Sequence, residues 1–232
     1  MNFGKAFRAA LHPPYWRAIA HAVVPTTEHA PALASIEPAT VIDVGANKGQ
    51  FSSFAASRWP KARILAFEPL PRPAGRYRRV LGDRATLFTC ALGAAEARLE
   101  MHVASREDSS SLLSLGDRQK SVFHMDEVAT VPVDVRRLDS VLDGLVTAPA
   151  LLKVDVQGYE YEVLEGLGNL IGYIEWIFVE TSFVELYAGQ HLHDDVAALL
   201  AELGYELTLE HNATLDGGQK VQADILFRKR PA

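Results

Sequence analysis

The 232-residue sequence contains a single cysteine, Cys90, and no apolar run long enough to cross a membrane. One thiol cannot build an internal disulfide framework, so the chain suits a reducing compartment and we expect a cytoplasmic protein. A membrane-spanning helix needs about 18 consecutive uncharged apolar residues, which no segment of the sequence offers. The first residues also lack the uninterrupted apolar stretch of a secretory signal, so we do not expect one.

Positive charge is also scarce, because 23 Lys and Arg against 29 Asp and Glu leave a formal net charge of −6. Proteins that bind nucleic acids or membrane surfaces need a basic face. The local basic cluster at residues 72–79 lies in a predicted helix, and we interpret it as a solvated face. We therefore expect no nucleic-acid partner.

Several catalytic motifs are missing as well. The sequence has neither the G-x-S-x-G turn of α/β hydrolases nor the H-E-x-x-H helix of zinc peptidases. His191 and His193 are two positions apart rather than four, so we interpret them as the polar start of a helix and assign no metal ligands.

What the sequence does contain is a strand, a glycine turn and a helical pattern in residues 40–58. The apolar run Val41–Val44 ends in a turn with Gly45 and Gly49. Such a unit binds nucleotides, because glycines let the backbone approach a ligand and the helix N-terminus offers unpaired N–H groups. Glu68 follows the next predicted strand, at the distance typical of an acid that binds a ribose diol.

The turn also indicates which nucleotide is bound. In the dinucleotide fingerprint G-x-G-x-x-G a second glycine approaches the pyrophosphate, and Asn47 stands in its place. This weakens the hypothesis of an NAD-linked oxidoreductase. S-adenosylmethionine (SAM), with a ribose and a small zwitterionic end, fits better, and Asp43 within the apolar strand is a candidate partner for its ammonium group. The alternative is that the glycines only shape an α/β turn.

From residue 39 onward, strands and helices alternate, which predicts an α/β domain with a mainly parallel sheet and helices on both faces. We assign residues 39–232 to this domain and residues 1–38 to an N-terminal helical extension. The extension could cover a site, join the subunits of a homodimer or simply pack. The alternation stops at residues 97–135, which we interpret as an insertion over the carboxyl edge of the sheet, where ligands bind. The remaining strands are predicted at 40–44, 63–67, 85–90, 151–156, 176–180, 205–209 and 223–227, with strands 97–104 and 128–135 inside the insertion.

Acids end three of the predicted strands, at Glu68, Asp155 and Glu180. Lys153 lies two residues before Asp155, so the two side chains share one side of the strand. A Lys and an Asp within an apolar run are costly to bury unless they pair with each other or serve a function. A purely structural ion pair remains the alternative. The aromatic-rich segment 180–190 is either a substrate loop or an ordinary packed connection.

Taken together, these segments resemble the FkbM-type SAM-dependent methyltransferases. The resemblance runs from about residue 10 to residue 228, and its most specific parts are Lys-x-Asp-x-x-Gly-x-Glu at 153–160 and Glu-x-Ser-Phe-x-Glu-Leu-Tyr at 180–187. It implies a seven-stranded, Rossmann-like class I methyltransferase fold and methyl transfer to a hydroxyl oxygen. Many relatives carry Glu where Gln157 stands. The other matching segments are 41–50, 67–69, 108–112 and 222–224.

We therefore expect a SAM-dependent O-methyltransferase for a small hydroxylated acceptor such as a sugar, glycoside or polyketide. The alternative is an interaction module that binds SAM or a nucleoside without catalysis. Asp155 is the expected general base, Lys153 its orienting partner or alkoxide stabiliser, and Glu180 a ligand of acceptor hydroxyls or a second base. Mg²⁺ held by the same acids is an alternative that stays open. The residues expected to contact SAM are Asp43, Gly45, Ala46, Asn47, Gly49, Glu68, Ala91, Leu92 and Ser111.

Overall fold

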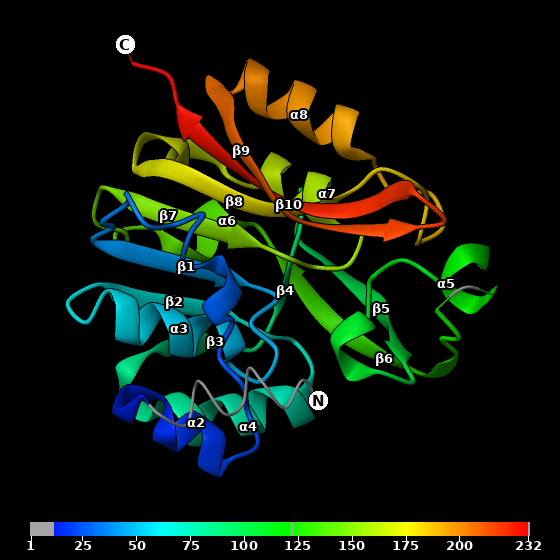
Figure 1. Ribbon diagram of the computed structural model, residues 1–232, viewed down its shortest axis with the longest axis horizontal. Helices are drawn as coiled ribbons and strands as arrows, with labels where there is room; N and C mark the ends of the chain where they lie inside the picture. The colour runs from blue at the N-terminus through cyan, green and yellow to red at the C-terminus, as the bar shows by residue number, and fades with distance from the viewer. Residues whose placement is uncertain (1–11, 122, 232) are drawn as a thin grey trace.

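A seven-stranded sheet forms the centre of the computed structural model, which describes residues 12–121 and 123–231 (Figure 1). The strand order is β3-β2-β1-β7-β8-β10-β9. Strands β3, β2, β1, β7 and β8 pair in parallel, whereas β10 runs antiparallel to both β8 and β9. The predicted mostly parallel α/β fold is therefore confirmed. The strands are β1 (Thr40–Val44), β2 (Arg63–Phe67), β3 (Thr86–Phe88), β7 (Ala150–Val154), β8 (Ile174–Ser182), β9 (Tyr205–Asp216) and β10 (Gln219–Lys229).

Helices cover both faces of the sheet, because the central strands are apolar on both sides. In β1, Val41 faces the side covered by α3, while Ile42 faces the side covered by α6, α7 and α8. Leu151 and Leu152 in β7 alternate in the same way, and all four side chains are fully buried. The helices are α2 (Trp16–Ala20), α3 (Gln50–Arg58), α4 (Pro71–Leu81), α5 (Asp117–Ser121), α6 (Leu138–Leu142), α7 (Glu160–Glu165) and α8 (His193–Glu202). Short 3-10 turns are η1 (Pro13–Tyr15), η2 (Thr27–His29), η3 (Gly82–Arg84), η4 (Glu107–Ser109) and η5 (Gly168–Gly172).

The predicted insertion at 97–135 supplies two strands and α5 of a second, three-stranded sheet of order β4-β6-β5, and β4 comes from residues just before it. Figure 1 shows β5, β6 and α5 beyond the carboxyl ends of the central strands. The predicted strand 85–90 is shorter than expected, because the chain leaves the large sheet after Phe88 and enters the small one at Ala91. The added strands are β4 (Ala91–Leu92), β5 (Ala97–Ala104) and β6 (Glu127–Arg136).

The described part of the N-terminal segment packs along the face that α3 and α4 cover. Ala18 and Val23 join the apolar cluster of α4, and Leu33 and Ile36 join that of α3. Residues 1–11 of the predicted helical extension lie outside the described residues. Among the described helices, none is long and apolar enough to cross a membrane.

Candidate active site

A cavity of about 460 Å³ opens at the carboxyl ends of β1, β2, β7 and β8. Strand order reverses between β1 and β7, since β2 lies on one side of β1 and β7 on the other. In open α/β sheets ligands bind at this switch point. The small sheet and the loop at 106–112 close the cavity on one side, and the segment at 26–29 and the β9–β10 hairpin close it on another.

Gly45 makes the turn after β1 possible. Its φ is +76°, and a Cβ added there would lie 1.8 Å from the carbonyl oxygen of Asp155. The next residue, Ala46, donates its backbone N–H to the carbonyl of Phe67 at 2.9 Å. This close approach of three chain segments explains why the position needs glycine, and it places Gly45, Ala46 and Asn47 on the cavity wall.

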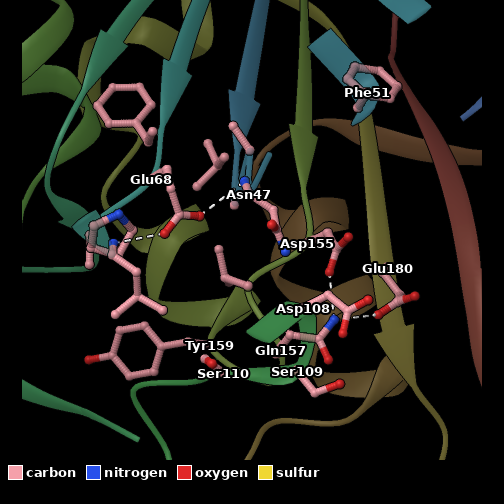
Figure 2. A pocket seen from close by; sticks show the side chains of 18 of the residues that line it. Asn47, Phe51, Glu68, Asp108, Ser109, Ser110, Asp155, Gln157, Tyr159 and Glu180 are labelled. Atoms are coloured by element: carbon pink, nitrogen blue, oxygen red, sulfur yellow. Dashed lines mark hydrogen bonds between the residues drawn. The ribbon is translucent and has the colours of Figure 1, made fainter. Parts of the chain in front are cut away.

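Glu68 lies on the same half of the cavity, held by the backbone (Figure 2). One carboxylate oxygen accepts the N–H of Asn47 at 3.0 Å and the other accepts that of Leu70 at 2.8 Å. Burial raises the pKa of Glu68 to about 7, although these two hydrogen bonds act in the opposite direction. Each oxygen keeps a free lone pair, so the carboxylate can still accept hydroxyl hydrogen bonds from a ribose.

The surroundings of Glu68 fit the rest of SAM. Asn47 has a positive φ of 47°, and its side-chain oxygen is buried without a hydrogen-bond partner among the described residues. Leu70, Ala91 and Leu92 supply an apolar wall. An unpaired polar group beside an apolar surface suits a ligand with a ribose and a flat base.

Asp43 takes a different position from the one expected. It is fully buried and does not line the cavity. Ser52 donates a hydrogen bond to it at 2.6 Å, and its other oxygen lies 3.5 Å from Nζ of Lys153. Asp43 therefore offsets the positive charge of Lys153 from a buried position behind the cavity wall. Direct contact with the ammonium group of SAM does not fit this geometry. Gly49, at the start of α3, and Ser111, which is almost fully buried, likewise lie behind the lining residues.

Lys153 connects this buried acid with the cavity. Its Nζ lies 3.4 Å from a carboxylate oxygen of Asp155 as well as near Asp43. Burial disfavours the charged ammonium, but the two carboxylates outweigh that effect and raise the pKa of Lys153. The lysine therefore stays charged. Asp43, Lys153 and Asp155 form a row of three charges, and Asp155, whose side chain is 36% exposed, is its accessible negative end.

Gln157 joins Asp155 to Glu180 (Figure 2). Its amide nitrogen donates to Asp155 at 2.7 Å and to Glu180 at 3.1 Å, and its amide oxygen accepts the hydroxyl of Tyr187 at 2.8 Å. Gln222 donates a further hydrogen bond to Glu180 at 3.1 Å. Burial, followed by the charges of Asp155 and neighbouring acids, raises the pKa of Glu180 well above its ordinary value. The three predicted catalytic residues thus line one cavity, with an amide bridge that the sequence did not indicate.

The segment 180–190, at the end of β8 and just beyond it, has a mixed role. Glu180 lies on the cavity wall, whereas Leu186 and Tyr187 are fully buried and pack beneath the insertion. The packing interpretation therefore holds for these two side chains. Tyr187 also packs against Gly158, where an added Cβ would lie 3.0–3.2 Å from its ring atoms. The motif at 153–160 and this segment fold against each other and fix the position of Gln157.

The polar wall residues that were missed include Thr26 and His29, from the segment before β1, and Thr214, from the C-terminal hairpin, and no local pattern marks these three. Gln222 lies in the segment 222–224 that carries part of the family resemblance, but its place on the wall was not predicted.

Together, the fold and the turn after β1 define a class I SAM-dependent methyltransferase. The fold is similar to that of fibrillarin from Aeropyrum pernix in complex with SAM, with a TM-score of 0.50 and 14% identity. That match covers 96% of this chain and 76% of the fibrillarin chain. The family model of the methyltransferase FkbM domain matches residues 43–207. The chain therefore belongs to the FkbM methyltransferase family, as its motifs predict.

Three of the named relatives are methyltransferases of known description. Methyltransferase 1 of Beauveria bassiana is 30% identical over 188 residues, which is 73% of each chain. The 2-O-methyltransferase NoeI of Sinorhizobium fredii is 30% identical, covering 65% of this chain and 66% of its own. The hexuronic acid methyltransferase AglP of Haloferax volcanii is 29% identical, covering 72% of this chain and 64% of its own.

Proposed function

We propose that this protein transfers the methyl group of SAM to a hydroxyl oxygen of a small, sugar-like acceptor. The observation that carries the proposal is that one cavity joins a nucleotide half around Glu68 to an acid pair at Asp155 and Glu180. The names of two relatives, a 2-O-methyltransferase and a hexuronic acid methyltransferase, support oxygen as the methylated atom and a sugar as the acceptor.

Bound SAM would supply a methyl group on a positively charged sulfur, and the protein must align the acceptor and remove its proton. Alignment in one cavity contributes much of such catalysis. We assign the general base to Asp155, the most accessible of the three charged residues Asp43, Lys153 and Asp155. Lys153 and Gln157 hold its two oxygens at 3.4 and 2.7 Å, so the carboxylate is oriented before the acceptor binds.

Glu180 has a different role in this proposal. Its raised pKa favours the protonated form, and Gln157 and Gln222 both donate to one of its oxygens. The other oxygen can then donate or accept a hydrogen bond with the acceptor. We therefore assign acceptor binding to Glu180 and leave the base role to Asp155.

Mg²⁺ is the alternative use of the same acids, because it would lower the pKa of the acceptor hydroxyl directly. The two carboxylates are hard oxygen ligands that suit such a cation. The Gln157 amide lies between them, however, and among the described residues no three His, Cys, Asp or Glu side chains are grouped as a metal centre requires. Turnover measured in EDTA and after adding Mg²⁺ distinguishes the general-base mechanism from the metal mechanism.

The decisive test is the turnover of Asp155→Asn, measured with labelled SAM and small-molecule extracts of the source organism. We expect turnover to fall about 100-fold or more, the range typical of a lost general base, with S-adenosylhomocysteine affinity retained. Loss of wild-type turnover in EDTA, restored by Mg²⁺, would move the mechanism to the metal. Near-normal turnover of Asp155→Asn would exclude both versions. Binding of S-adenosylhomocysteine with no transfer to any acceptor would indicate a binding module.

A further inference from the structure

The half of the cavity beyond Asp155 is built from both ends of the chain. Thr26 and His29 come from the segment before β1, and Thr214 and Gln222 come from the β9–β10 hairpin. All four positions lie outside residues 43–207, the part that the family model matches. Most of this wall therefore lies outside the residues that the family model matches, although Gln222 belongs to the motif at 222–224, and we expect acceptor specificity to be set there.

His29 is a residue of this wall whose ring lacks, within the described part of the chain, a hydrogen-bond partner at one buried nitrogen. Its side chain is 11% exposed and packs edge-on against Phe178, with ring centroids 5.1 Å apart, and at a tilt against Phe51. Nδ1 has no hydrogen-bond partner among the described residues. The hydroxyl of Thr26, on the same wall, is also buried and unpaired there. Unpaired buried polar groups are costly. Nδ1 of His29 faces Asp224, whereas the Thr26 hydroxyl belongs to a residue of the cavity wall and can be satisfied by a ligand.

Asp224 lies behind His29. One carboxylate oxygen is 3.5 Å from Nδ1 of His29 and accepts a hydrogen bond from Asn212 at 3.1 Å. The distance to His29 is longer than a normal hydrogen bond, and such contacts often shorten when substrate binds. An Nδ1–H donated to Asp224 would leave the second ring nitrogen as a hydrogen-bond acceptor.

The electrostatics of this wall are consistent with a neutral imidazole. Burial lowers the pKa of His29 to about 4, although the charge of Glu28 acts in the opposite direction. Burial raises the pKa of Asp224 to about 6, against the hydrogen bond from Asn212. Above pH 6, an ionised Asp224 therefore lies beside an uncharged His29. The lysine and arginine that line the cavity are both paired with acids elsewhere, Lys153 with Asp43 and Asp155 and Arg106 with Asp108, so neither belongs to this wall.

We propose that His29, oriented by Asp224, binds a second hydroxyl group of the acceptor while the reacting hydroxyl lies at Asp155. This rests on the proposed O-methyl transfer and narrows its substrate class. The acceptor carries at least two hydroxyls and no carboxylate or phosphate at the end that meets His29. His29 contacts the acceptor, and Asp224 is a positioning residue.

The test is His29→Phe, which keeps an aromatic ring against Phe51 and Phe178 but removes both ring nitrogens. The matched control is His191→Phe, because His191 also stacks on an aromatic ring, Tyr161, and does not line the cavity. With labelled SAM and limiting extract, we expect His29→Phe to lose about tenfold in rate, the effect of one hydrogen bond at the upper end of its range. S-adenosylhomocysteine affinity should stay within about twofold for both variants, as expected for residues outside the cofactor half.

A second measurement separates acceptor contact from a structural role. Once the labelled product is identified, each deoxy analogue of the acceptor is assayed with the wild type and with His29→Phe. One analogue should raise KM for the wild type and leave KM for His29→Phe unchanged. Asp224→Asn should raise KM for the intact acceptor and should not affect cofactor affinity. If His29→Phe does not fold, His29→Asn replaces it in the same assays.

Normal transfer by His29→Phe would overturn the inference, as would a parallel loss of S-adenosylhomocysteine affinity. Equal effects of every deoxy analogue on both proteins would overturn it as well. If the wild type binds S-adenosylhomocysteine but transfers no label, the proposed function itself fails, and this inference falls with it.

Discussion

At the scale of single residues, Glu68 offers a direct measure of the proposed cofactor site. Its pKa is raised to about 7, so the carboxylate gains its charge between pH 6 and pH 8. A ribose diol donates to the ionised form, whereas the protonated form has lost one acceptor. We therefore predict that affinity for S-adenosylhomocysteine rises as the pH increases from 6 to 8. Isothermal titration calorimetry at several pH values would measure this.

The matching variants are Glu68→Ala and, as a control, Glu202→Ala, which changes an exposed acid of α8. Loss of a charge-assisted contact should cost about 1.5–3 kcal/mol of binding free energy for Glu68→Ala and remove the pH dependence. Unchanged affinity of Glu68→Ala would show that the ribose lies elsewhere.

The same scale shows which site residues a sequence can reveal. Lys153, Asp155 and Glu180 were recognisable because charged residues at the end of apolar strands are unusual, and the strand order brings them together. Gln157 and His29 carry no such signal. Their roles depend on partners distant in sequence, Glu180 for the amide and Asp224 for the imidazole. Asp43 was misplaced for the related reason that a buried acid can balance a lysine instead of a ligand.

At the scale of elements, the turn after β1 depends on Gly45. We predict that Gly45→Ala abolishes S-adenosylhomocysteine binding and lowers stability, because φ is +76° and a Cβ would lie 1.8 Å from the Asp155 carbonyl oxygen. The control is Gly75→Ala within α4, where an added Cβ meets no atom within 4 Å. That variant should gain about 0.5–1 kcal/mol, as alanine does over glycine in a helix. Calorimetry and chemical denaturation test both, and normal binding by Gly45→Ala would contradict the prediction.

The loop at 106–112 is the second element with a testable role. It lines the cavity through Asp108, Ser109 and Ser110, and its contacts to the body include Tyr187 to the Ser109 carbonyl at 3.1 Å. A loop with few apolar anchors should order when ligand fills the site. We predict slower hydrogen exchange in this loop with S-adenosylhomocysteine and acceptor, and little change in β2. Equal exchange in all states would contradict a closing loop.

The buried strands were predicted from the sequence more accurately than the exposed ones. The central strands β1, β2 and β7 were predicted to within two residues, because each is a short, mainly apolar run that is buried almost throughout. In contrast, β9 extends to Asp216, well past the predicted strand end at Leu209. Most of its side chains are exposed, so no alternation of apolar and polar residues marks them. The break between β3 and β4 was missed because one apolar run serves both sheets.

At the scale of the whole molecule, buried acids gather at the cavity wall and behind it. Burial raises the pKa of four of them, to about 7 for Glu68 and Glu160, to about 6 for Asp224 and well above its ordinary value for Glu180. In each case the folded state holds its proton to a higher pH than the unfolded chain, so stability falls as the pH rises from the unfolded pKa through the folded pKa. His29, whose pKa is lowered to about 4, acts in the opposite direction up to its unfolded pKa of about 6.5 and has little effect above it.

The four acids outnumber His29 and His193, whose pKa burial also lowers. We therefore predict that the ligand-free protein loses stability between pH 5 and pH 8, by a few kcal/mol at about 1 kcal/mol per group and pH unit. Chemical denaturation across this range would measure the loss. Glu160→Gln should flatten the slope whatever it does to absolute stability, because Glu160 is buried and titrates within the range. Glu202→Gln, an exposed change, should leave the slope unaltered. A stability that rises with pH would mean that these carboxylates are ionised at little cost, and that the site is wetter than its burial indicates.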